Sequence, residues 1–303
     1  MSESTIKRLI NNPWRIFNSF ARRGWLNRMP DKLYLSLIYR AAFGKKLDWE
    51  KPKTFNEKLQ WLKLNDRKDE YTKMVDKYEA KQLVTNYIGE KYIVPVVGGP
   101  WKNFDDIDFN VLPDQFVLKT THDCGGVVIC KNKAEFDKSY AKRFIDRHLQ
   151  RNYYLTCREW PYKNIEPKIF AEKYISDENN FILPVYKIFC FNGLPKIIQA
   201  IQNDKQKDET IDYFDIHWNN LKLKQNFPNS KKIPQHPKNL ENMVNIAREL
   251  SKGHAFLRID LYEANGNIYF SEYTFYSDAG LAKFEPAEWD EILGSWIKLP
   301  IDD

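Results

Sequence analysis

The sequence predicts an α+β fold, in which helical stretches and antiparallel hairpins are grouped instead of alternating. Apolar segments flank Asn192-Gly193 and again Asn265-Gly266, and an Asn-Gly pair between such segments is a strong hairpin signal. Helical stretches lie around these hairpins, without the regular strand–helix–strand order of a parallel sheet. We therefore expect α+β lobes and not a doubly wound sheet.

Individual elements follow from local signals. Thr54 has Glu57 three residues later, which is the spacing of a capping box and predicts a helix start. The run from Pro95 to Pro100 contains two glycines and is expected to be a break. Helices are predicted over 53–64, 69–87, 134–155, 238–252 and 286–297. Strands are predicted over 115–121, 127–133 and 168–175, besides the two hairpins.

The composition indicates a globular chain with one basic end. Of the 303 residues, 43% are hydrophobic and 29% charged, which is ordinary for a soluble domain. The net charge is +6, and the first 50 residues, with ten basic and four acidic side chains, carry all of it. The remainder is neutral, which argues against nucleic acid as the main substrate.

The lack of targeting signals and the spacing of the cysteines predict a cytoplasmic protein. The sequence has no apolar run of about 18 residues and no secretory leader pattern at its N-terminus. The four cysteines form no C-x-x-C pair, so we expect free thiols in a reducing compartment and no metal site built from them.

The basic end has the pattern of an amphipathic helix over residues 6–29. Ile6, Ile10, Trp14, Phe17 and Phe20 recur at three-to-four-residue spacing, with lysines and arginines between them. Such a helix can lie on an anionic membrane surface. It can also dock its apolar stripe on the protein and leave its charges in water. The sequence leaves both alternatives open.

The last hairpin carries acidic and basic residues that can do chemistry. Arg258 and Asp260 share one face of its first strand, and Glu272 lies on the second strand. A two-residue turn would place the two carboxylates on opposite faces. We expect a three-residue turn, which sets Arg258 opposite Glu272 and Asp260 on the same face. Two carboxylates and an arginine on one surface predict a Mg²⁺ and phosphate site, and the alternative is a cross-strand salt bridge on a solvated sheet.

A glycine loop follows an earlier strand. Lys119 ends this strand, and Gly125 and Gly126 follow in the loop. Glycines allow backbone N–H groups to approach phosphate oxygens, and a lysine supplies a point charge. The loop is not a Walker A motif, and a plain glycine turn is the alternative. His122 could touch a substrate, but a hydrogen bond within the loop is the simpler expectation.

Taken together, the motifs resemble a known family. The order is Asp76-Lys77, the lysine and glycine loop, a Glu172–Ile175 segment, and then R-x-D with a downstream acid. This order resembles the ATP-grasp superfamily. Seven segments resemble more closely the TupA-like ATP-grasp family, which is linked to teichuronopeptide and surface-polysaccharide synthesis. These segments are TFNEKLQWLK, DKYEAKQLV, FVLKTTHDCGG, EKYI, YKIFCFNG, FLRIDLYE and YFSEYTF. The resemblance runs from about residue 45 to the end and implies two α+β lobes that grip ATP.

The resemblance implies roles for the residues that would meet the phosphates. Lys77 and Lys119 match two lysines that hold ATP phosphates. Gly125 and Gly126 match a loop that closes over the triphosphate. Arg258 matches an arginine that stabilises an acyl-phosphate transition state.

The resemblance also implies an adenine site and a metal site. The segment Glu172-Lys173-Tyr174-Ile175 matches the hinge between lobes, where the backbones of residues 173 and 175 bond adenine. Asp260 and Glu272 match Mg²⁺ ligands, whereas Thr274 stands where the superfamily often has asparagine. The expected domains are a helical region 1–70, a first lobe 71–175 with the glycine loop, and a C-terminal lobe 176–303 with the metal-binding hairpin.

Two features depart from the family pattern. TupA-like chains often carry an acidic residue before Tyr-Lys in the first hairpin, and Val185 stands there. The ribose contact is therefore unassigned, with Asp177 and Glu178 as weak candidates. The usual Rossmann-like lobe before the core has no counterpart, because residues 1–70 look helical.

The expected function is a ligase that uses ATP and Mg²⁺ to activate a carboxylate and join it to an amine through an acyl phosphate. The family link suggests an amino acid or uronic acid as carboxylate donor, at the inner face of the membrane. The main rival is a glycosyltransferase, supported by the D-x-D sequence Asp106-Ile107-Asp108. A small-molecule kinase and a nucleotide-binding protein without catalysis are further alternatives.

Overall fold

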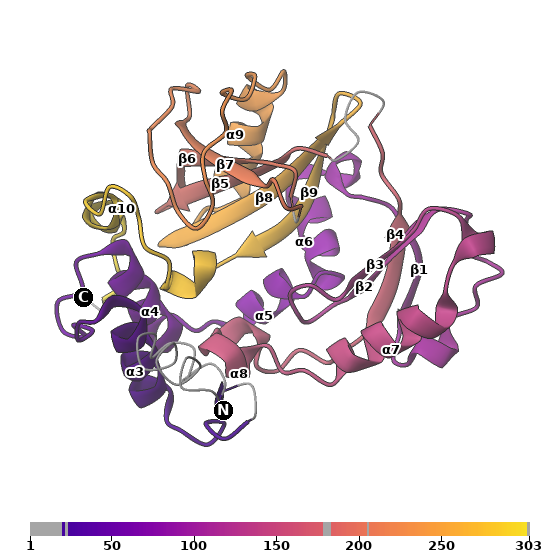
Figure 1. Ribbon diagram of the computed structural model, residues 1–303, viewed down its shortest axis with the longest axis horizontal. Coiled ribbons are helices and arrows are strands. Elements are labelled where there is room, and N and C mark those ends of the chain that lie inside the picture. The colour runs from indigo at the N-terminus through magenta and orange to yellow at the C-terminus, as the bar shows by residue number, and fades with distance from the viewer. Residues whose placement is uncertain (1–19, 22–23, 178–182, 205, 302–303) are drawn as a thin grey trace, which may run out of the picture.

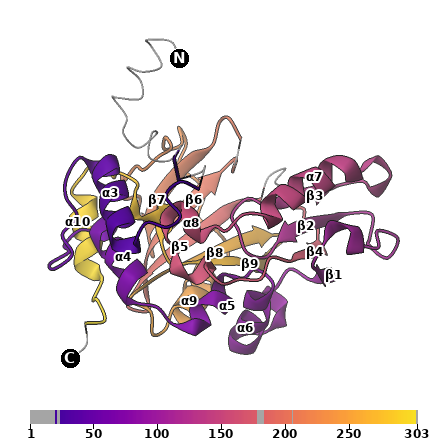
Figure 2. The ribbon, with the colours of Figure 1, turned by 90° about the horizontal axis from the view of Figure 1, so that it is seen from below.

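The computed structural model describes residues 20–21, 24–177, 183–204 and 206–301, and these form two antiparallel sheets with helices around them (Figure 1). The predicted α+β fold is confirmed. The small sheet has the order β1-β4-β2-β3, and the large sheet has the order β7-β6-β5-β8-β9. Figures 1 and 2 show the small sheet with α7 at one end of the molecule and α3, α4 and α10 at the other.

The small sheet consists of β1 (Val96–Trp101), β2 (Phe116–Thr120), β3 (Val127–Cys130) and β4 (Ile169–Lys173). Side chains alternate between its two faces. One face packs with α7 (Lys138–Leu149) into a core that includes Leu118, Val128 and Ala171. The other face presents Val117, Lys119 and Glu172 to a cavity.

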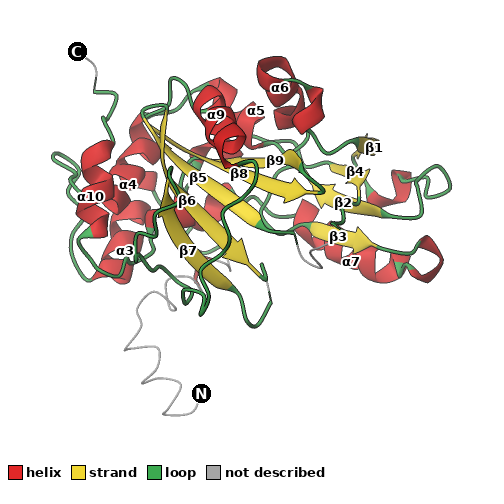
Figure 3. Cartoon of the chain, turned by 90° about the horizontal axis from the view of Figure 1, so that it is seen from above, coloured by secondary structure: helices red, strands yellow, loops and turns green. Residues whose placement is uncertain are grey.

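The large sheet consists of β5 (Val185–Phe191), β6 (Leu194–Gln202), β7 (Thr210–Asp215), β8 (Phe256–Ala264) and β9 (Asn267–Thr274). The predicted hairpins at Asn192-Gly193 and Asn265-Gly266 are both present, as β5–β6 and β8–β9. The predicted helix α9 (Leu240–Leu250) covers one face of the sheet (Figure 3). Its apolar side belongs to the largest core of the described residues, together with Ile188, Ile198 and Ile259.

Three helices pack together at the end of the molecule away from the small sheet. They are α3 (Asp31–Phe43), α4 (Phe55–Asn65) and α10 (Trp289–Trp296). The predicted capping box begins α4, because Thr54 accepts from the N–H of Glu57 and Glu57 accepts from the N–H of Thr54. Most of the basic leader, residues 6–29 with the pattern of an amphipathic helix, lies outside the described residues. In the described part of the chain, no helix has the length and apolarity needed to cross a bilayer.

The predicted single helix over 69–87 is wrong, because the structure has two helices there. They are α5 (Asp69–Val75) and α6 (Glu79–Ile88). Asp76 leaves the helical conformation, and its Oδ1 accepts from the N–H groups of Tyr78 and Glu79 at 2.8 and 3.0 Å. A side chain that competes for backbone N–H groups in this way ends one helix and begins the next.

Other boundaries also differ from the predictions. The predicted helix 134–155 is α7 followed by the short α8 (Tyr154–Cys157). The expected break at Pro95–Pro100 is the edge strand β1, where a Cβ on Gly99 would lie 2.9 Å from Cα of Phe170. β7 had no predicted counterpart. The 3-10 turns are Glu90–Tyr92 (η1), Phe104–Asp106 (η2), Lys133–Glu135 (η3), Trp160–Tyr162 (η4) and Ser277–Gly280 (η5).

Candidate functional site

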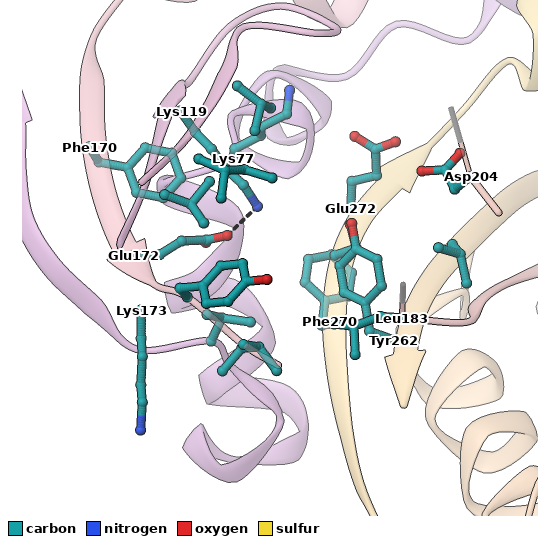
Figure 4. Close-up of a pocket in the computed structure, with 18 of the residues that line it drawn as sticks. Lys77, Lys119, Phe170, Glu172, Lys173, Leu183, Asp204, Tyr262, Phe270 and Glu272 are labelled. Atoms are coloured by element: carbon teal, nitrogen blue, oxygen red, sulfur yellow. Dashed lines mark hydrogen bonds and ion pairs between the residues drawn. The ribbon is translucent and has the colours of Figure 1, made fainter. Parts of the chain in front are cut away.

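A cavity of about 480 Å³ lies between the facing surfaces of the two sheets. Figure 4 shows Lys119 and Glu172 on its small-sheet side and Tyr262, Phe270 and Glu272 on its large-sheet side. Among the predicted site residues, those that line it are Lys77, Lys119, Gly125, Glu172, Lys173, Tyr174, Ile175 and Glu272. Those outside its lining are Gly126, Arg258, Asp260 and Thr274.

The turn of the last hairpin differs from the expected three-residue turn. Asn265 and Gly266 form a two-residue turn, and both have positive φ angles, of 49° and 76°. Such a turn would put the two carboxylates on opposite faces. However, the register shifts between the Leu261–Phe270 and Asp260–Glu272 pairs, so that Ser271 is an extra residue in β9. This β-bulge sets Asp260 directly opposite Glu272 on one face.

Arg258 and Asp260 form a buried pair beside the cavity. The guanidinium Nε and Nη2 donate to Oδ1 and Oδ2 of Asp260 at 2.7 and 2.8 Å. It also donates to the hydroxyls of Thr274 and Ser277, at 3.1 and 3.0 Å. Burial opposes the charge of Arg258, but the carboxylate of Asp260 outweighs it and raises the pKa of the guanidinium. Asp260 is thus oriented by the arginine next to it.

Glu172 is shared by two lysines from different elements. Lys119 on β2 pairs with its Oε1, and Lys81 on α6 lies 3.0 Å from its Oε2. Burial would raise the pKa of the Glu172 carboxyl, but Lys119 and Lys81 outweigh burial and lower it. Burial likewise opposes the charged form of Lys119, and Glu172 reverses the direction and raises its pKa. The sequence analysis missed Lys81, which meets Glu172 from the first turn of α6.

The glycine loop and Lys77 are fixed to each other. The N–H of Lys77 donates to the carbonyl of Thr121 at 2.9 Å, and its Nζ donates to the carbonyl of Asp123. The break between α5 and α6 makes this possible, because it takes Lys77 out of a helix. Gly125, with φ of 93°, lines the cavity. Gly126 packs so closely on Thr120 that a Cβ would lie 1.9 Å from its Oγ1.

His122 is part of the loop's support. It is buried, and its Nε2 lies 3.1 Å from the carbonyl oxygens of both His148 and Arg151. These are structural hydrogen bonds, but they go to the end of α7 and the residues after it, and not to the loop itself as expected. Asp123 in the same loop pairs with the hydroxyl of Thr120 and with Nδ1 of His148.

The hinge segment forms one end of the cavity. The side chain of Lys173 points away from it (Figure 4), and the N–H of this residue donates to the carbonyl of Pro95 at 2.9 Å. Within the described ranges, no hydrogen bond from the N–H of Ile175 to the protein is present. Phe170, Leu183 and Phe270 supply apolar walls nearby. Flat apolar walls beside backbone polar groups suit a nucleobase.

The ribose candidates fare differently. Asp177 accepts a hydrogen bond from the N–H of Asn265 at 2.6 Å, which ties the hinge to the hairpin turn. Glu178 lies outside the described residues. The loop between β6 and β7 brings Asp204 and Gln206 to the cavity, and Figure 4 shows Asp204 on its large-sheet side.

A second acid lies close to Arg258. Glu159, which precedes η4, is 5% exposed. Burial raises the pKa of its carboxyl to about 7, with Lys63 and Arg258 lowering it and Glu272 and Asp278 raising it. No local motif marks this residue, which lies between the short α8 and η4.

The D-x-D sequence is used for local structure. Oδ2 of Asp106 accepts from the N–H of Asn103 at 3.0 Å, and Oδ1 of Asp108 accepts from the N–H of Asn110 at 2.9 Å. Neither residue lines the cavity. The rival interpretation as a nucleotide-sugar site therefore loses its one local support.

Comparison with known proteins gives a family match. The model of the TupA-like ATPgrasp family matches residues 57–298. No curated protein matches the sequence. Similar solved structures include D-alanine–D-alanine ligase from Bacillus anthracis complexed with ATP (17% identity, TM-score 0.40, 67% of this chain and 55% of that one).

Two further solved structures are similar at the same level. They are D-alanine–D-alanine ligase from Helicobacter pylori (14%, 0.44, 80% and 69%) and the ATP-grasp ligase PsnB complexed with a precursor variant, Mg and ADP (11%, 0.38, 89% and 65%). The chain thus spans 55% to 69% of the length of these three proteins.

Proposed function

Because this chain belongs to the TupA-like ATP-grasp family, we propose that it is a ligase that uses ATP to activate a carboxylate for attack by an amine. One observation carries the proposal. One cavity is lined by Lys119 from the small sheet, by Lys77 from the break between α5 and α6, and by the carboxylate of Glu272 from the large sheet. The lysines suit phosphate groups, and the carboxylate suits Mg²⁺.

We propose that ATP lies across the cavity with its base at the hinge. The carbonyl of Lys173 and the N–H of Ile175 contact adenine, between Phe170 and Phe270. The phosphates lie toward Lys77 and Lys119 and under the loop of Gly125 and Gly126. Asp204, which lines the cavity, replaces Asp177 as the ribose contact. The two proposed lobes, 71–175 and 176–303, then hold the nucleotide between them.

The residues at the phosphate end fit Mg²⁺. Asp260 and Glu272 are oxygen donors opposite each other on neighbouring strands, with Thr274 adjacent. Among the described residues, no group of three His, Cys, Asp or Glu side chains could hold a metal on its own. This suits Mg²⁺, which takes one or two carboxylates and completes its shell with phosphates and water. The metal would neutralise charge on the β- and γ-phosphates.

The proposed reaction has two steps. An oxygen of the substrate carboxylate attacks the γ-phosphorus, the bond to the β-phosphate oxygen breaks, and ADP leaves. Arg258 and Lys119 stabilise the charge that develops on the transferred phosphoryl group. The amine then attacks the acyl carbon, phosphate leaves, the amine loses a proton, and an amide forms. The glycine loop excludes water, which would otherwise hydrolyse the acyl phosphate.

The proposed biological setting comes from the family resemblance. We propose that the amide joins an amino acid or uronic acid to a capsule or other surface polysaccharide, at the inner face of the membrane. The basic leader would then hold the enzyme near anionic lipid. Ligation assays with candidate substrates test the choice of substrate, and a membrane-binding assay tests the contact with lipid.

The Asp260→Asn variant tests the proposal. The wild-type protein is expected to bind Mg·ATP in calorimetry and to release ADP and phosphate when a carboxylate and an amine are present. Asp260→Asn is expected to lower ADP release at least about 100-fold, because the metal loses an anionic ligand and Arg258 its partner. Asp106→Asn is the matched control and should leave the rate unchanged.

The other outcomes are equally distinct. UDP release from a UDP-sugar would instead indicate a glycosyltransferase. A phosphorylated acceptor without free phosphate would indicate a kinase. Near-normal turnover of Asp260→Asn would remove this residue from the metal site.

A further inference from the structure

Lys81 has no role in the scheme above, although it is a charged residue buried beside the cavity. Its side chain is 11% exposed. Its Nζ donates to the carbonyl of Val94 at 2.9 Å and lies 3.0 Å from Oε2 of Glu172. Its backbone is in the first turn of α6, where Oδ1 of Asp76 accepts from the N–H of Glu79 at 3.0 Å. Lys81 is therefore anchored by its helix, by a backbone carbonyl and by a carboxylate.

Lys119 is held less firmly. It pairs with the other oxygen of the same carboxylate, and its side chain is 17% exposed. In the part of the chain that the structure describes, Glu172 is the only hydrogen-bonding or ion-pair partner of its ammonium group. One buried carboxylate thus lies between a lysine with several anchors and a lysine with one, and the latter faces the cavity.

We propose that Lys81 is a positioning residue for ATP binding: it holds and neutralises Glu172, so that Lys119 can leave this carboxylate and pair with a phosphate oxygen. The inference rests on the proposed function, because it needs a triphosphate in the cavity. Moving Lys119 away from a buried carboxylate that had no second partner would leave an uncompensated charge, which is strongly unfavourable. With Lys81 in place, Glu172 keeps a partner in both states.

A simpler account must be separated from this one. Lys81 also lines the cavity, so its positive charge could attract phosphate directly. The direct attraction does not depend on residue 172, whereas the proposed effect acts only through the Glu172 carboxylate. A double-mutant cycle that measures ATP affinity distinguishes the two.

The experiment measures the Kd of Mg·ATP by calorimetry for the wild type, Lys81→Met, Glu172→Gln and the double variant. We expect Lys81→Met to weaken binding about tenfold, because Lys119 then stays with Glu172. In the Glu172→Gln background, the same substitution should change the Kd less than about threefold. An equal loss in both backgrounds, or no loss in the wild-type background, would overturn the inference.

Control variants distinguish the role of Lys81 from an effect on folding and from a failure of the proposed function. Lys81→Gln keeps a donor for the carbonyl of Val94 without a charge and replaces Lys81→Met in the cycle if the latter does not fold. Lys91→Met removes an exposed lysine of η1 and should leave the Kd unchanged. If the wild type does not bind Mg·ATP, the proposed function fails. If it binds and the cycle shows no coupling, only the role of Lys81 fails.

Discussion

At the scale of single residues, Glu159 is a buried acid with charges of both signs nearby. Its carboxyl pKa of about 7 lies well above the ordinary value of 4.5, first because of burial and then because Glu272 and Asp278 are close. The folded protein therefore binds a proton there that the unfolded chain has already lost between pH 4.5 and 7. The stability contributed by this group falls as the pH rises through that interval.

We predict that Glu159→Gln changes the pH dependence of unfolding. A neutral amide avoids the cost of a buried charge, so the variant should gain on the order of 1–3 kcal/mol relative to the wild type between pH 5 and pH 8. Urea unfolding without Mg²⁺ at both pH values measures the difference. Glu135→Gln, at an exposed position, is the control. Parallel pH curves for wild type and Glu159→Gln would contradict the assignment.

At the scale of elements, local signals decided the starts of helices and the turns of hairpins. The capping box at Thr54 and both Asn-Gly turns could be predicted because they depend on neighbouring residues alone. The bulge at Ser271 could not be predicted. It depends on how β9 pairs with β8 over several residues, and it decides on which face Glu272 lies.

We predict that Thr54→Ala destabilises the protein by about 1 kcal/mol, because the N–H of Glu57 loses its side-chain acceptor at the start of α4. Denaturant unfolding measures the loss. Ser139→Ala, at an exposed position in the first turn of α7, should change stability by less than about 0.5 kcal/mol. Equal effects of the two substitutions would show that the capping box contributes nothing.

At the scale of the whole molecule, the site depends on two sheets with separate cores. The small sheet supplies Lys119 and Glu172, and the large sheet supplies Tyr262 and Glu272. A ligand that contacts both walls stabilises the folded state of the two sheets together. The relative position of the sheets is therefore part of the site.

We predict that Mg·ATP at about 100 times its Kd stabilises the protein by about 2.7 kcal/mol. This corresponds to a rise of about 4–6 °C in the unfolding temperature. Calorimetric scans measure it, with Mg²⁺ alone as the control. Hydrogen exchange should slow in both β2–β4 and β8–β9, and protection confined to one sheet would contradict a site shared by the two.

The sequence by itself determined the fold class and the family, and eight of the twelve predicted site residues line the cavity, because short motifs keep their spacing and chemistry in the folded chain. Only the tertiary structure showed that Lys81 shares Glu172 with Lys119, that Glu159 lies near Arg258 and that Asp204 reaches the cavity. These residues come from segments far apart in the chain. A local sequence pattern does not indicate which distant charges come together in the folded protein, where burial strengthens their interaction.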